Sequence, residues 1–276
     1  MILLIGLIIG LVLGLTGAGG SIFAVPLLVL VLGLPVPIAA GLSLGAVCIA
    51  SAIGVLIRLR SKQIEWLPAF VFAGVGSLTV PFGGLISNQL NEVVLLGSFS
   101  LLVAVIAVRL WRQASRLPAE ASSVRAQSGV LPLSNQSALC GTDALSIQNF
   151  RLSCFLKVSI AAAVTGLLSG VYGVGGGFVI VPVLVSLLRM DIRNAVATSL
   201  VVIAIVSAVG FASFSARVEV DPAVLGLLGL GGMGGMLLGL LFSRAIAGPV
   251  LQKIFAVLMV ILTAVMLLTH FMVTGQ

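Results

Sequence analysis

Charged residues are scarce in this sequence. Only 8% of its 276 residues are charged and 60% are hydrophobic, whereas a soluble domain carries about 25% charged residues. A water-soluble globule of this length could not remove so much apolar surface from water. A lipid bilayer must therefore surround most of the chain, which excludes a cytosolic enzyme, a secreted disulfide scaffold and a disordered protein.

Residues that bind metals or carry covalent chemistry are also few. The three cysteines, Cys48, Cys140 and Cys154, have no metal-ligand spacing, and His270 is the one histidine. A G-x-S-x-G pattern around Ser43 lies inside an apolar run and lacks a His/Asp pair, so it does not predict a hydrolase. We expect no catalytic residue, no metal site and no cofactor, and we expect that the protein is not an enzyme.

Acidic side chains are missing from the interior of the long apolar runs. Glu65, Glu92, Glu219 and Asp221 all fall at the ends of these runs. Pathways for protons or metal cations usually contain buried Asp, Glu or His, so this distribution favours an anion as passenger. The 14 Lys and Arg residues occupy short polar gaps, as in cytoplasmic membrane loops, and do not predict a nucleic-acid partner.

The apolar runs define the fold class, an all-α polytopic membrane protein with about eight membrane-embedded helical segments. Six runs have the length of one membrane crossing, about 20 residues: 38–57, 66–88, 92–111, 194–214, 222–243 and 251–271. The runs 2–34 and 158–188 are too long for one ordinary helix, and each contains a cluster of glycines. Because glycine inside a helix costs about 1 kcal/mol relative to alanine, each cluster predicts two half-length helices joined by unwound backbone.

The two halves of the chain form an internal repeat with one constant offset. The pattern G-x-G-G-x-x-x-x-x-P starts at Gly17 and again at Gly173, and the register continues without a gap over about 100 residues. Two residues related by this offset are repeat equivalents. We therefore divide the chain into a first membrane half at 1–112, a polar cytoplasmic loop at 113–156 and a second membrane half at 157–276.

The relative orientation of the two repeats depends on the broken runs. If each broken run returns to its own side, each half crosses the membrane three times and the repeats are inverted. In that case 13 of the 14 Lys and Arg residues lie inside and only Arg217 lies outside. If each broken run crosses once, the repeats are parallel, with 10 inside and 4 outside. The positive-inside rule favours inversion and leaves eight single crossings as the alternative.

The two glycine breaks are the predicted substrate-binding site. Unwound backbone at membrane depth occurs only where protein or a polar cavity surrounds it. The helix after each break presents free N–H groups and a positive dipole end, which attract an oxyanion. The alternatives are that the glycines only permit tight packing and that the hydroxyls bond their own helix. The predicted residues are Thr16, Gly17, Gly19, Gly20, Ser21, Ser43, Tyr172, Gly173, Gly175, Gly176, Gly177, Thr198 and Ser199.

Residues 14–28 and 170–184 resemble the duplicated signature of the TauE/SafE sulfite exporter family, and residues 195–200 are similar to another stretch of it. The resemblance covers both halves but not the central loop. It implies a multi-pass secondary transporter of the bacterial inner (cell) membrane, with about eight transmembrane segments. It also implies small sulfur oxyanions, sulfonates or related organic anions as substrates. The first copy departs from the pattern, because Ser21 stands in place of the third glycine.

These patterns together predict a secondary transporter of a small anion, such as sulfite or a sulfonate, that works by alternating access. The resemblance favours export. A passive anion channel and a non-transport membrane scaffold are the alternatives. The expected partners are the anionic substrate and the lipid bilayer, with no nucleic acid, while a homo-oligomer stays open. Asn194, beside Arg193, is predicted to be a structural helix N-cap.

Overall fold

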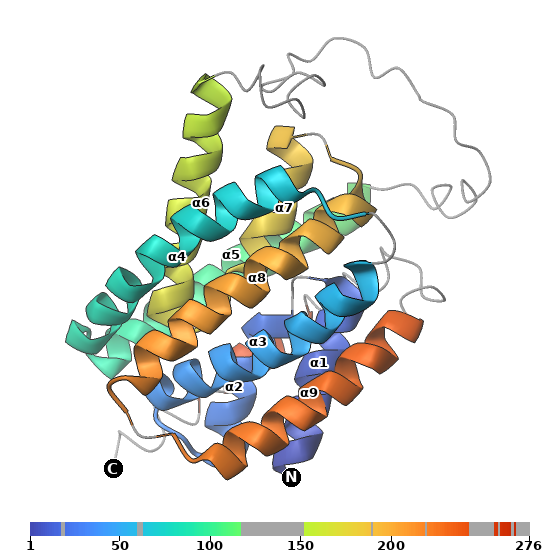
Figure 1. Ribbon diagram of the computed structural model, residues 1–276. Helices are drawn as coiled ribbons and strands as arrows, with labels where there is room; N and C mark the ends of the chain where they lie inside the picture. Colours follow the sequence, from blue (N-terminus) through green and yellow to red (C-terminus); the bar gives the residue numbers. More distant parts are fainter. Residues whose placement is uncertain are drawn as a thin grey trace.

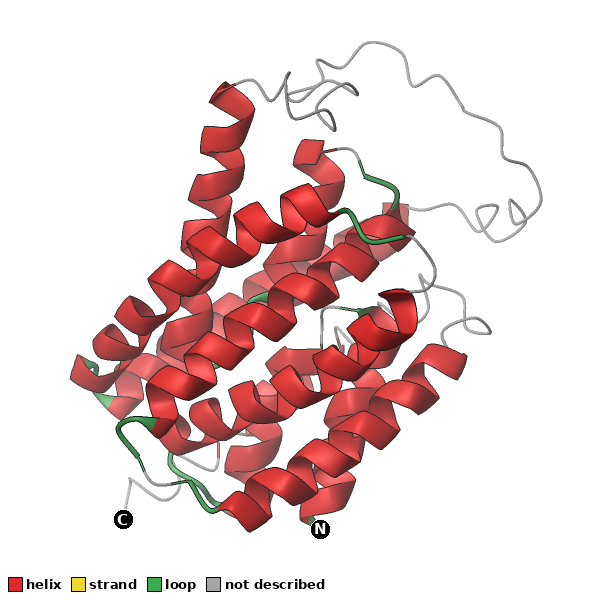
Figure 2. Cartoon of the chain, viewed as in Figure 1, coloured by secondary structure: helices red, strands yellow, loops and turns green. Residues whose placement is uncertain are grey.

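The computed structural model describes residues 1–17, 20–59, 63–116, 152–188, 190–218, 220–242, 257–258, 260–265 and 268. Within these ranges every regular element is a helix, as Figure 2 shows, and the all-α prediction is confirmed. The helices are α1 (Ile2–Thr16), α2 (Gly20–Leu32), α3 (Val36–Leu59), α4 (Trp66–Gln89), α5 (Glu92–Arg116), α6 (Leu152–Tyr172), α7 (Gly177–Leu188), α8 (Ile192–Ser215) and α9 (Pro222–Phe242).

Five helices in this described part, α3, α4, α6, α8 and α9, are long and apolar enough to cross a membrane. Helices α1 and α2 and the apolar part of α5, Val93–Val108, are shorter. Large apolar side chains such as Phe70, Leu78 and Phe82 point outward on α4, as expected for a surface that contacts lipid. Most of the predicted loop, residues 117–151, and His270 lie outside the described residues.

Glycine brings α1 and α9 into backbone contact, and the two helices lie side by side in Figure 1. A Cβ atom at Gly10 would overlap the carbonyl of Gly232, and one at Gly235 would overlap the carbonyl of Leu7. The same packing joins α4 to α6, where a Cβ atom at Gly83 would overlap the carbonyl of Leu167. Small residues thus let both helix pairs approach closely, as in other membrane helix interfaces.

Helices α3 and α8 lie together at the centre of the molecule, with α4 packed on α8 and α9 packed on α3 (Figure 1). The two central helices run in opposite directions. Gly41, near the start of α3, contacts Phe214 near the end of α8, and Gly45, one turn further along α3, contacts Phe211, about one turn earlier in α8. Both helices are mostly buried, so protein surrounds each glycine break on the side that contacts α3 or α8.

The helix boundaries repeat along the chain. The first and last residues of α8 are the repeat equivalents of the first and last residues of α3. The last residues of α6 and α7 are likewise the equivalents of the last residues of α1 and α2. Helices α4 and α9 begin at Trp66 and Pro222, which are equivalents as well.

Candidate functional site

Both glycine clusters interrupt the helix, as predicted. Helix α1 ends at Thr16, and the following residue, Gly17, takes a left-handed conformation with φ 71° and donates its N–H to the Leu13 carbonyl at 2.7 Å. In the second half, Gly173 has φ 67° and donates its N–H to the Ser169 carbonyl at 2.9 Å. Gly175 and Gly176 follow with φ 64° and 66°. Only glycine adopts such angles without strain, so the sequence ends the helices here.

Each break is capped by a serine from the central helix of the other half. Ser43 of α3 donates a hydrogen bond to the Gly173 carbonyl at 2.5 Å. Ser199 of α8, the repeat equivalent of Ser43, donates to the Gly17 carbonyl at 3.3 Å. Both serines are fully buried. Each hydroxyl also lies within hydrogen-bond distance of a carbonyl of its own helix, Ala40 for Ser43 at 2.7 Å and Val196 for Ser199 at 2.9 Å. Its one hydrogen is therefore shared between that carbonyl and the glycine carbonyl that unwinding leaves without a helical partner.

Removing one of these caps is expected to destabilise the fold without unfolding it. Ser43→Ala leaves the Gly173 carbonyl without its cross-half donor, which costs about 1–3 kcal/mol for a buried acceptor. The measurement is the thermal unfolding temperature in detergent. Ser100→Ala is the control, because the exposed Ser100 hydroxyl bonds only the carbonyl of Gly97 in its own helix. An equal effect of both substitutions would contradict the capping role of Ser43.

Two further serines converge on the second break without any hydrogen-bond partner. Ser21, in the first turn of α2, and Ser207, in the middle of α8, are fully buried, and neither hydroxyl is bonded. A Cβ atom at Gly175 would lie 2.9 Å from the Ser207 Oγ and 3.6 Å from the Ser21 Cβ. Residues from the two halves of the chain thus meet at one point, beside the start of both α2 and α7.

This cluster is polar but has no charged member. In the described part of the chain, all fully buried polar residues are serine or threonine, and no group of His, Cys, Asp and Glu could hold a metal ion. The first N–H groups of α2 and α7 have no partner within their helices. Hydroxyl and amide donors, together with two positive helix ends, form an environment suited to an anion.

The other predicted site residues have varied surroundings. The Thr16 hydroxyl donates to the Val12 carbonyl at 2.8 Å, and the Tyr172 ring packs against Phe99 with centroids 5.7 Å apart. Thr198 lies one residue before the capping Ser199 and accepts the backbone N–H of Glu65 at 3.1 Å.

The remaining glycines are close to the breaks. Gly20 and Gly177 are the first residues of α2 and α7 and are buried, while Gly19 lies outside the described residues.

The prediction that Asn194 is the N-cap of α8 is wrong. Asp191 is the residue with extended backbone before α8, and the Asn194 side chain instead donates to the Glu65 Oε1 at 3.5 Å.

From the sequence, Ser207 is one of the membrane-helix hydroxyls that could donate to an anion but is not among the predicted site residues, and nothing in the sequence indicates Ser169. Ser169 is fully buried with an unbonded hydroxyl, and a Cβ atom at Gly176 would lie 3.7 Å from its Cβ. The sequence signals for Ser207 are its hydroxyl inside an apolar run and its repeat equivalence to Ser51. Ser169 is the equivalent of Leu13, so the repeat itself could not have indicated it.

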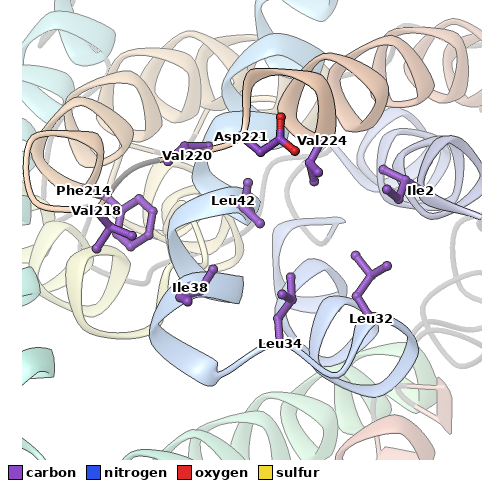
Figure 3. A pocket seen from close by; sticks show the side chains of 10 residues that line it. All are labelled: Ile2, Leu32, Leu34, Ile38, Leu42, Phe214, Val218, Val220, Asp221 and Val224. Carbon is purple, nitrogen blue, oxygen red and sulfur yellow. The ribbon is translucent and has the colours of Figure 1, made fainter.

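A cavity of about 290 Å³ opens at one end of the helices, between α1, α2, α3, α8 and α9 (Figure 3). Its lining is apolar except for Asp221, whose carboxylate caps α9 by accepting the Ala223 N–H at 2.9 Å. Leu42, only 5% exposed, is part of the lining and directly precedes the capping Ser43. The cavity is therefore lined by the residue next to Ser43, whose hydroxyl contacts the second break.

The sequence pattern of the family described as sulfite exporter TauE/SafE matches residues 2–266. The chain belongs to this family. A relative from Xylella fastidiosa (strain Temecula1), named "Probable membrane transporter protein", is 33% identical over 199 residues, which are 72% of this chain and 67% of the relative.

Two more distant relatives carry names of the same kind. One from Methanocaldococcus jannaschii is 26% identical over 262 residues, 92% of this chain and 86% of its own length. One from Bacillus subtilis is 26% identical over 207 residues, 74% of this chain and 73% of its own length. No solved structure matches the chain. The TauE/SafE resemblance read from residues 14–28 and 170–184 is confirmed.

Proposed function

We propose that this TauE/SafE protein is a secondary transporter that exports a small anion, such as sulfite or a sulfonate, across the bacterial inner membrane. The observation that carries the proposal is that two buried serines with unbonded hydroxyls, Ser21 and Ser207, lie together beside Gly175. Buried polar groups in proteins are almost always hydrogen-bonded. An anion at this point would accept both hydroxyl hydrogens and backbone N–H groups from the starts of α2 and α7.

The charge of the site suits an anion that must be both bound and released. A helix N-terminus carries about +0.5 elementary charge, so two such ends offset roughly one negative charge. No full positive charge is among the buried residues of the described chain. Binding is therefore strong enough to select an anion and weak enough to release it, which a transporter requires.

We propose inverted repeats as the architecture. The helix boundaries that recur at equivalent residues support two repeats. The antiparallel crossing of α3 and α8 supports inversion, because a two-fold axis in the membrane plane reverses equivalent helices. Ile2 at the start of α1 and Leu34 after α2 line the same cavity, which supports a broken helix pair that returns to its own side.

The positive-inside rule then orients the molecule. The segment around Arg58 and the central loop face the cytoplasm, and the cavity lined by Asp221 faces outward. Alternating access would arise from rocking of one repeat against the other around the breaks.

Transport of sulfite, thiosulfate, sulfoacetate and simple carboxylates into proteoliposomes tests the function, with thermal shift measuring binding of the same anions. We expect a sulfur oxyanion or sulfonate to stabilise the protein and its flux to saturate. Flux that does not saturate and needs no counter-ion would indicate a channel instead. The absence of both flux and thermal shift with every anion would indicate a scaffold, and either result would contradict the proposal.

Replacing the Ser207 hydroxyl is expected to weaken anion binding. Ser207→Ala removes one charge-assisted hydrogen bond, worth about 1.5–3 kcal/mol, so the apparent Kd should rise roughly 10- to 100-fold. Ser213→Ala is the matched control on the same helix, because the Ser213 hydroxyl already bonds the Val209 carbonyl at 2.9 Å. Unchanged affinity in Ser207→Ala, measured by the thermal shift titration, would remove Ser207 from the site.

A further inference from the structure

The two ends of the central helix pair differ, although the repeat relates them. At the cavity end, Leu42 and Asp221 are part of the lining. Their repeat equivalents are Thr198 and Glu65. These two are hydrogen-bonded to each other, because the Glu65 backbone N–H donates to the Thr198 Oγ1 at 3.1 Å. Leu42 and Asp221 thus line a cavity at one end of the α3–α8 pair, whereas their equivalents Thr198 and Glu65 contact each other at the opposite end.

Asn194 adds a second bond at the closed end. Its side-chain amide donates to the Glu65 Oε1 at 3.5 Å, and its repeat equivalent is Ile38, an apolar residue of the cavity lining. The connection from α7 to α8 and the segment that enters α4 lie together at this end of the molecule (Figure 1). Met190 and Ile64 in these segments are buried at 8% exposure, so little space is left between them.

We infer that Glu65, Asn194 and Thr198 form the gate that closes the anion site at the end opposite the cavity. The inference rests on the proposed function and adds the residues that control passage. Thr198 directly precedes Ser199, the residue that caps Gly17, so movement of α4 away from α8 at Glu65 would uncover the first break. The orientation proposed above places this gate on the cytoplasmic side.

Two features of the gate favour its opening. Both hydrogen bonds join α8 to a single residue, Glu65, which precedes the first residue of α4, and the 3.5 Å bond to Asn194 is long. The second carboxylate oxygen of Glu65, Oε2, is buried and has no hydrogen-bond partner. A buried acceptor without a donor destabilises the closed arrangement, so opening exchanges weak contacts for solvation of the carboxylate. The cavity end, whose equivalent residues are mostly apolar, would close by packing instead.

A pair of introduced cysteines at equivalent positions can report the two ends separately. We would place Leu34→Cys at the cavity end or Met190→Cys at the gate end, in a chain with Cys48, Cys140 and Cys154 replaced by serine. The rate of modification by a bulky polar maleimide is measured in lipid nanodiscs, where both faces meet the reagent. We expect Leu34→Cys to react at least about tenfold faster than Met190→Cys while the gate is intact.

Breaking the gate should reverse this preference. Thr198→Val with Asn194→Ile, which removes both hydrogen bonds, is expected to raise the Met190→Cys rate by about five- to 100-fold, the shift that follows from loss of two ordinary hydrogen bonds. The Leu34→Cys rate should fall in parallel, because alternating access couples the two ends. Ser213→Ala serves as the control and should change neither rate.

Unchanged rates in the gate variant would overturn the inference. A faster Met190→Cys reaction without a slower Leu34→Cys reaction would also overturn it, because local loosening would then explain the result. The labelling needs no ligand. Wild-type protein that neither binds nor transports any anion would therefore count against the proposed function, while the reciprocal labelling pattern would still identify the gate.

Discussion

Gly235→Ala is expected to destabilise the protein by about 1–3 kcal/mol or more, the cost of adding a methyl group to a well-packed interface. The new Cβ atom would overlap the Leu7 carbonyl of α1 and would lie 2.6 Å from the Leu11 backbone nitrogen. Both are backbone atoms, so no side chain can rotate to make room and the two helices must separate. The thermal unfolding temperature and the fraction of monodisperse protein in detergent should both fall.

Gly234→Ala, at the neighbouring residue of α9, is the matched control. A Cβ atom at Gly234 meets no atom within 4 Å. Alanine is favoured over glycine in a helix interior by about 1 kcal/mol, so this variant should be as stable as the wild type or more stable. If both substitutions changed the unfolding temperature equally, close packing of α1 against α9 would not be the reason for glycine at position 235.

Gly175→Ala is expected to reduce transport by about two orders of magnitude, equivalent to roughly 2.7 kcal/mol. Its Cβ atom would lie 2.9 Å from the Ser207 Oγ and 3.6 Å from the Ser21 Cβ, so the serine side chains beside the proposed anion site would have to move. The left-handed φ of 64° adds strain of about 1–2 kcal/mol for a residue with a side chain. Initial flux in proteoliposomes is the measurement, normalised to the amount of folded protein.

Gly33→Ala separates backbone strain from obstruction of the site. Gly33 has φ 63°, and a Cβ atom there would meet nothing within 4 Å. It should therefore lose a similar amount of stability while its flux stays near the wild-type value. Comparable loss of transport in both variants would mean that strain, not occupancy of the site at Gly175, causes the defect.

The helices were largely predictable because apolar length and glycine position act locally. The run 194–214 corresponds to α8 (Ile192–Ser215), and the glycine clusters coincide with the end of α1 and with the gap between α6 and α7. Lipid imposes these features on any sequence that spans it, since every backbone group must be bonded within the protein. The repeat register also indicated that Ser43 and Ser199 are equivalent, and the structure gives them equivalent partners.

Contacts between distant segments could not be predicted in the same way. The sequence predicts Thr198 at the break, but its hydroxyl oxygen accepts a hydrogen bond from the backbone N–H of Glu65, which is 133 residues away in the chain. The Asn194 prediction failed because Asp191 already supplies the extended residue before α8. The unbonded state of the Ser207 hydroxyl does not follow from sequence, because it depends on how the helices pack. The same holds for the cavity at one end of the α3–α8 pair and the contact between Glu65 and Thr198 at the other end.

Anomalous diffraction from the protein in complex with selenite, a heavier analogue of sulfite, tests the central claim most directly. The account predicts a selenium peak at the start of α2 and α7, with selenite oxygens within hydrogen-bonding distance of the Ser21 and Ser207 hydroxyls. It also predicts that the peak disappears in Gly175→Ala but persists in Gly33→Ala. Saturable selenite transport with a peak elsewhere in the protein, or with the peak retained in Gly175→Ala, would contradict it.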